Sequence, residues 1–119
     1  MMETDFQSDD LLPWDANSVA FSQHSISTAD NDNWKWENIR ACNAFMQDYE
    51  LSPETEAVKH RYAGEILFFK TLDYFNKVKR FGDVPWYDKV LVPGDEDLYK
   101  GRDSRITVVA NTIKDIDQA

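Results

Sequence analysis

Acidic side chains are the most abundant groups in this sequence that could do chemistry, because two carboxylates can act as the general acid and base of a hydrolase. The chain has 22 Asp and Glu among its 119 residues. Most of them fall in predicted loops or in the first turns of predicted helices, where no rigid scaffold would hold a pair across a cleft. We interpret them as solvated surface charge, and the sequence predicts no enzyme activity.

Other motifs that could carry chemistry are incomplete. Residues 30–33 (Asp-Asn-Asp-Asn) begin like a calcium loop, but Trp34 and Lys35 follow where an oxygen ligand and a glycine are needed. His24 and His60 lie far apart and beside no Ser or Cys elbow. One Cys and two His cannot build a common structural zinc site, and no glycine-rich phosphate loop exists. We predict no catalytic residue, no metal site and no cofactor.

Composition places the chain among folded, acidic proteins. Hydrophobic residues make up 42% and aromatic residues 13%, which is enough to form a core. The formal charge of −9 disfavours nucleic-acid binding. No apolar run is long enough to span a membrane. The start has neither the basic residues nor the apolar stretch of a secretory signal, so the protein is either cytoplasmic or has lost a targeting segment.

Charge and periodicity divide the chain into two parts. Residues 1–33 contain no Lys or Arg, are rich in Asp, Asn, Ser and Thr, and show no sustained apolar period. We predict an irregular segment there, with Trp14 as an anchor that pins it to the remainder. Residues 34–119 show helical periodicity, and the predicted fold class is all-α.

Three helices are expected, near 34–50, 55–81 and 104–119. The first should begin with Asp32 or Asn33 as its N-cap, the second with Ser52 as N-cap and Pro53 in its first turn, and the third with Asp103 or Ser104. Apolar residues recur at helical spacing in the first (Ile39, Cys42, Met46, Tyr49) and in the third (Ile106, Val109, Ala110, Ile113, Ile116).

The middle helix carries further signals. Residues 62–75 are apolar nearly all round, which predicts neighbours on two or more sides. Gly64 in the helix interior predicts a close approach by another helix backbone. Gly82 should end the helix and Pro85 should keep it from resuming. The apolar stripe of the third helix continues towards Ala119, so we expect an incomplete fragment of a larger domain whose continuation is missing.

Four groups of residues together resemble the N-terminal half of the SusD/RagB family. They are Trp34-x4-Ile39-Arg40-x2-Asn43-x-Phe45, then Gly64-Glu65-Ile66-Leu67-Phe68-Phe69-Lys70, then Asp73-Tyr74-Phe75-x2-Val78-x2-Phe81-Gly82-Asp83-Val84-Pro85, and Arg102-Asp103-Ser104-Arg105 with the helix after it. The set is fairly specific in order and spacing, although each piece alone would be weak. The chain departs from the family at Lys70-Thr71, where an Arg-Ala pair is usual. Because Lys lacks bidentate geometry, a fixed salt bridge there is in doubt.

The resemblance implies a tetratricopeptide-like helical scaffold within a surface lipoprotein of the outer membrane. Such a protein binds a glycan or another nutrient and works with a TonB-dependent (SusC-like) transporter; the signal and lipidated Cys are absent from this sequence. In sugar-binding members the segment ahead of the Trp-rich helix can contribute a ring and an amide. Here that segment offers Trp14 and Asn17 as ligand-binding residues. The alternative for Trp14 is the anchor role given above. Trp86 and Tyr87 are expected to be structural.

Two functions remain open at this point. One is a substrate-binding lipoprotein, with an oligosaccharide or another nutrient as its ligand. The other is a helical-repeat module for protein–protein interaction without a small ligand, which is all that the physical pattern alone supports.

Overall fold

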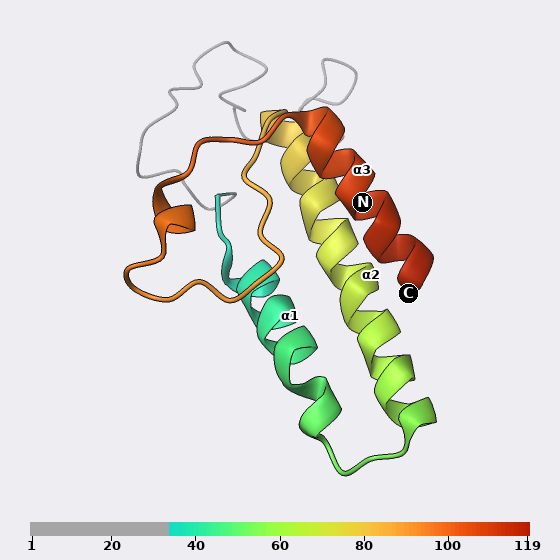
Figure 1. Ribbon diagram of the computed structural model, residues 1–119. Coiled ribbons are helices and arrows are strands. Elements are labelled where there is room, and N and C mark those ends of the chain that lie inside the picture. The colour runs from blue at the N-terminus through green and yellow to red at the C-terminus, as the bar shows by residue number, and fades with distance from the viewer. Residues whose placement is uncertain (1–33) are drawn as a thin grey trace, which may run out of the picture. The chain divides into compact units, whose positions relative to one another are not determined.

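The computed structural model describes residues 34–119, which form three helices and the segments that join them (Figure 1). These are α1 (Glu37–Asp48), α2 (Glu56–Phe81) and α3 (Arg105–Gln118). Two short 3-10 turns accompany them, η3 (Tyr49–Leu51) and η4 (Glu96–Tyr99). The predicted all-α class is confirmed. The irregular lead-in predicted for residues 1–33 lies outside the described residues.

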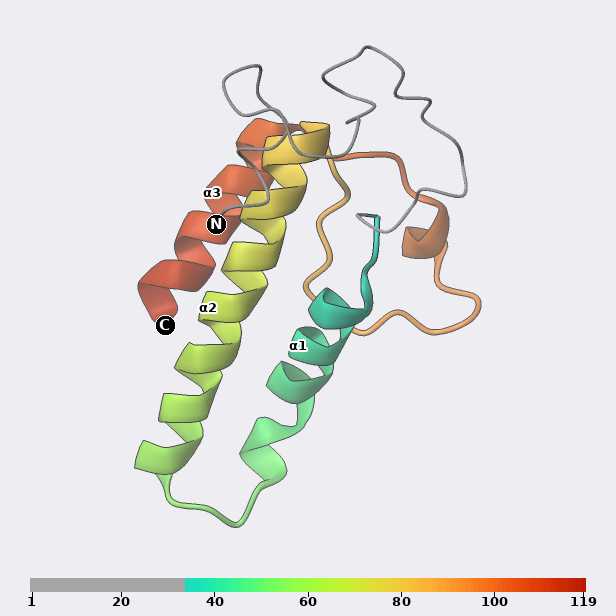
Figure 2. The same ribbon diagram turned by 180° about the vertical axis from the view of Figure 1, so that it is seen from behind.

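The helices run down, up and down, with α2 between α1 and α3 in both views (Figures 1 and 2). The expected close approach at Gly64 is confirmed. A Cβ added there would lie 2.5 Å from the backbone oxygen of Ala119 at the end of α3. Only a glycine lets the end of α3 pass this close to α2.

The core gathers where the end of α2 meets the beginnings of α1 and α3. Tyr74, Val84 and Val108 are fully buried and Ile39 is nearly so. Half-buried rings and apolar side chains surround them: Trp34, Trp36, Val78, Phe81, Trp86 and Tyr87. Tyr74 packs against the tilted Trp86 ring at 4.4 Å between centroids. The structural role predicted for Trp86 and Tyr87 is therefore confirmed.

The segment between α2 and α3, residues 82–104, is called the connection below. Gly82 ends α2 with a φ of 72°, as expected from its freedom at positive φ. The two ends of the connection are tied together, because Asp103 N–H donates to the Val84 carbonyl at 3.2 Å. Ser104 caps α3 by accepting from Thr107 N–H. Asp83 also accepts from Arg105 N–H, at 2.8 Å.

Two predicted helix starts are wrong. Trp36 is the N-cap of α1 and makes no side-chain cap bond. Trp34 and Trp36 pack against the core before α1 begins at Glu37. Thr55 precedes α2, and Ser52 accepts only from Glu54 N–H at 3.4 Å. The residues after η3 form bends before the second helix begins.

The structure shows a salt bridge at Lys70, where the chain departs from the family pattern. The Lys70 side chain is 5% exposed, and Nζ lies 3.0 Å from Asp115 Oδ2 on α3. The contact lacks hydrogen-bond alignment, since Oδ2 has no hydrogen-bond partner among the described residues. The ammonium also lies over the Trp86 ring, 4.7 Å from its centroid. A single ion pair and a cation–π contact thus replace bidentate geometry here.

Candidate functional site: a hollow between α1 and the connection

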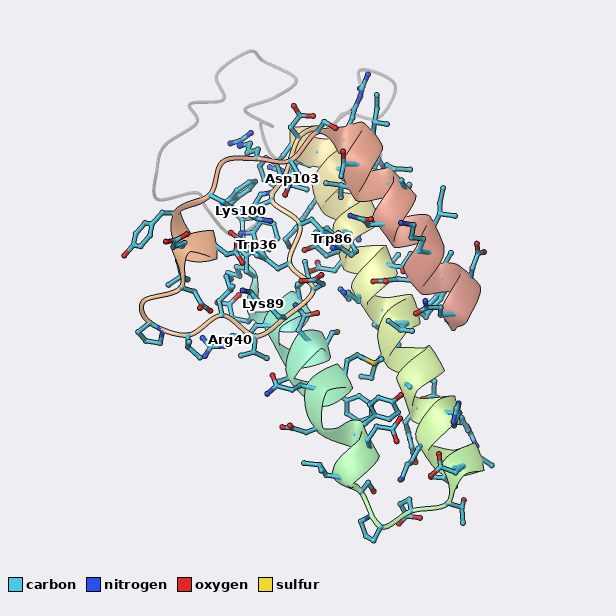
Figure 3. The ribbon with its side chains drawn as sticks, in the orientation of Figure 1. Trp36, Arg40, Trp86, Lys89, Lys100 and Asp103 are labelled. Carbon is cyan, nitrogen blue, oxygen red and sulfur yellow. The ribbon has the colours of Figure 1, made fainter. Side chains whose placement is uncertain are left out.

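A hollow of about 730 Å3 lies between the first turns of α1 and the connection. Figure 3 shows Trp36, Arg40, Lys89 and Lys100 gathered in this region. Its described lining residues come from two stretches of the chain: Trp34, Lys35, Trp36, Glu37, Ile39, Arg40 and Asn43 from the first, and Pro85, Tyr87, Lys89, Leu91, Leu98, Lys100, Gly101 and Arg102 from the second. Its size falls within the range of about 300–1,000 Å3 common for small-molecule sites.

Helix geometry places one wall. Trp36, Arg40 and Asn43 follow one another at +4 and +3, so that they share one face of the α1 turn. Asn43 is 3% exposed, and its amide nitrogen donates to the Tyr87 carbonyl at 3.0 Å and to the Lys89 carbonyl at 3.2 Å. This one amide therefore holds the connection against α1 and fixes the distance between the two walls.

Tyr74 and Asp103 hold the second wall, which the connection forms. The Tyr74 oxygen accepts from Tyr87 N–H at 2.7 Å. Asp103 Oδ2 accepts from Trp86 N–H at 2.7 Å and forms an ion pair with Lys100 at 3.1 Å. The hydrogen bond from the Trp86 N–H, together with Lys100, holds the pKa of the Asp103 carboxyl below its usual value, although partial burial acts to raise it. Lys100 Nζ also donates to the Trp86 carbonyl.

Three aromatic rings face each other edge to face along the hollow. Trp34 and Trp36 lie 5.3 Å apart between centroids, and Trp36 and Tyr87 lie 5.4 Å apart. All three side chains are half-buried. Rings in this state keep a part of their surface for a ligand while their neighbours hold their orientation.

The hollow is also basic, although the chain is acidic. Among the lining residues within 34–119, five are Lys or Arg and Glu37 is the single acid. The basic residues were not predicted as site residues. They come from residues 35–40 and 89–102, where acidic residues such as those at 95–97 stand between them in the sequence. Because these acids lie outside the lining, the sequence does not show that the hollow is basic.

The predicted site residues Trp14 and Asn17 lie outside the described residues, and their proposed role stays a prediction. Within residues 34–119 no cluster of three or more His, Cys, Asp or Glu could hold a metal ion. In the same range no helix combines the length and the apolar character needed to cross a membrane.

No protein-family model matches the chain, and no curated protein matches it. Among solved structures, it is similar to a SusD-like protein from Bacteroides fragilis NCTC 9343, with 30% sequence identity and a TM-score of 0.75. The match covers 86% of this chain but 20% of that protein, so the chain spans about a fifth of its length. The sequence resemblance is confirmed at the level of structure, and the chain is SusD-like in fold.

Proposed function

We propose that this chain serves in the substrate-binding component of an outer-membrane import system, lipid-anchored at the cell surface beside a TonB-dependent, SusC-like transporter. The observation that carries the proposal is the match in fold and sequence to a SusD-like protein over most of the chain. The proposed substrate is a glycan. We infer binding rather than catalysis, because ring faces and fixed cations recognise a ligand without breaking its bonds.

The hollow between α1 and the connection supports a binding function. Its walls are fixed by part-buried hydrogen bonds, one that the Asn43 amide donates and one that the Tyr74 oxygen accepts, so the site is organised before a ligand arrives. In the preceding segment, Trp14 and Asn17 remain our proposed ligand-binding residues.

Antibodies raised against residues 34–119 test this proposal in the bacterium that produces the protein. Protease treatment of intact cells should remove the signal, and detergent extracts of the outer membrane should yield the protein together with a β-barrel transporter. Deletion of its gene should slow growth on one glycan and leave growth on glucose unchanged. A protein that stays protected inside intact cells and co-purifies without a barrel would overturn the proposal.

A helical-repeat interaction module is the second candidate, and a specific observation favours it. Large apolar side chains are exposed on two helices, namely Phe68, Phe69, Leu72 and Phe75 on α2 and Ile106, Val109, Ile113 and Ile116 on α3. Exposed apolar surface of this extent marks protein contacts. The same antibody purification separates the two candidates, since the module would be recovered with helical partner proteins and without a transporter.

A further inference from the structure

We propose that the hollow binds an acidic sugar, a unit that carries a carboxylate or a sulfate. This inference rests on the proposed function and narrows its substrate class from glycans in general to anionic ones. It stands on the distribution of charge, on the state of each cation and on the rings beside them.

The charge distribution is strongly asymmetric. Within residues 34–119, five of the 13 Lys and Arg residues line this hollow, against one of the 15 Asp and Glu residues in the same range. A surface with the average composition of this chain would carry more acids than bases. Low-dielectric walls strengthen the field of such a cluster, so the hollow attracts anions although the whole protein repels them.

The two lysines that the connection contributes are partly neutralised. Lys89 pairs with Asp97 at 2.8 Å and Lys100 pairs with Asp103 at 3.1 Å. These pairs hold the lysines in place and leave the two arginines as the stronger anion ligands.

The two arginines are placed to receive an anion. The Arg40 side chain has no ion-pair partner within residues 34–119 and is exposed. Arg102 lies over the Trp34 ring, 4.9 Å from its centroid, a contact that orients the guanidinium while its N–H groups stay available. A guanidinium donates two parallel hydrogen bonds to a carboxylate or a sulfate, which a neutral sugar cannot use in this way.

The rings supply the sugar-binding part of the same site. Trp34, Trp36 and Tyr87 line the hollow together with the cations. The C–H faces of a sugar pack against an aromatic ring while its hydroxyls stay in water. An acidic sugar thus satisfies both kinds of side chain, whereas a neutral sugar would leave the arginines unused.

Calorimetry on the full 119-residue chain tests the inference with three probes: an oligogalacturonide for carboxylates, a chondroitin sulfate oligosaccharide for sulfates, and maltoheptaose as the neutral control. At least one acidic probe should bind, more weakly as salt is raised, and maltoheptaose should not. Arg40→Gln and Arg102→Gln should each weaken binding by about tenfold.

Arg61→Gln is the matched control. Arg61 is also exposed, lies on α2 outside the hollow lining and pairs with Glu65, so its loss should leave binding unchanged. Circular dichroism should show the same helix content in all three variants. Absence of binding to both acidic probes, equal binding of maltoheptaose, or equal loss in the Arg61 variant would overturn the inference. None of these results depends on where the protein resides in the cell, so the cell-surface experiment judges the proposed function separately.

Discussion

The phenol oxygen of Tyr74 on α2 accepts a hydrogen bond of 2.7 Å from the backbone N–H of Tyr87 in the connection. Tyr74 is fully buried, so this bond satisfies a backbone donor next to the hollow and links the core to one wall. The contact ties the stability of the helices to the geometry of the candidate site.

Tyr74→Phe should therefore destabilise the chain by about 1–3 kcal/mol, the cost of leaving a buried donor unsatisfied. Denaturant unfolding followed by circular dichroism measures the difference. Tyr99→Phe is the control, because Tyr99 is 89% exposed and its change should have little effect. Equal stability of the Tyr74 and Tyr99 variants would show that the bond to Tyr87 contributes nothing net.

Alkaline pH should destabilise the protein through the same residue. Burial raises the pKa of the Tyr74 phenol above its ordinary value, because the charged form loses its hydration. The folded-state pKa lies above that of the unfolded chain, so the stabilising contribution is complete below about pH 10 and is lost as pH rises beyond it. Burial also raises the pKa of Tyr87. Unfolding free energies measured between neutral pH and pH 11 should fall less steeply in Tyr74→Phe than in the parent.

The ion pair between Lys70 and Asp115 joins α2 to α3. Lys70→Met leaves the carboxylate, 18% exposed, without its cation and should cost about 2–4 kcal/mol. Adding Asp115→Leu should restore much of that loss, because an apolar pair needs no compensation of charge. Lys114→Met on the exposed face of α3 is the matched control. If the double variant is as unstable as Lys70→Met, packing rather than charge accounts for the effect.

Glycine conformation gives a prediction at the start of the connection. A side chain at Gly82 would be strained, since its φ is 72°, and Gly82→Ala should cost about 1–2 kcal/mol. Gly101→Ala has open space around the new Cβ and no positive φ, so it should be neutral or slightly stabilising. Thermal melts of the two variants compare them directly. Similar melting temperatures would contradict the role of Gly82 as a required helix end.

The sequence predicted the helices well because local signals determine them. The stripe of Ile39 and Cys42 is buried as expected, and Gly82 ends α2 within one residue of the prediction. Helix starts were harder, since the tertiary packing of Trp34 and Trp36 outweighed the cap preference at residues 32–33. The hollow was beyond sequence reasoning altogether. Its cations come from two separate stretches that meet because Asn43 binds carbonyls 44 and 46 residues away.

The third helix shows a different limit. Periodicity selected Ile106, Val109 and Ile113 as an apolar stripe that needs a partner helix missing from this chain, and these residues are 78%, 43% and 52% exposed within residues 34–119. The residue that α3 buries in the core is Val108, which lies beside this stripe. An apolar stripe indicates a helix face that another element can cover, but it does not predict which face of α3 packs against α2. Here α2 contacts the side that carries Val108 and Asp115.

These exposed faces lead to a last prediction, on self-association. Phe69 and Phe75 on α2 are 57% and 59% exposed, and exposed apolar surface of this kind associates in water or binds hydrophobic dyes. The 119-residue chain should therefore show concentration-dependent light scattering and dye fluorescence. Phe69→Lys and Phe75→Lys should reduce both signals, because a charge in such a contact loses hydration without gaining a partner.

Leu51→Lys separates this effect from a simple change in net charge. Leu51 is 82% exposed in η3, away from the apolar stripes of α2 and α3, and its substitution adds the same positive charge. It should leave scattering and dye binding nearly unchanged. A parent chain that stays monomeric, binds no dye and melts cooperatively above about 65 °C would contradict the prediction. In that case the exposed rings of α2 would be tolerated surface, and the argument for an interaction module would lose its one supporting observation.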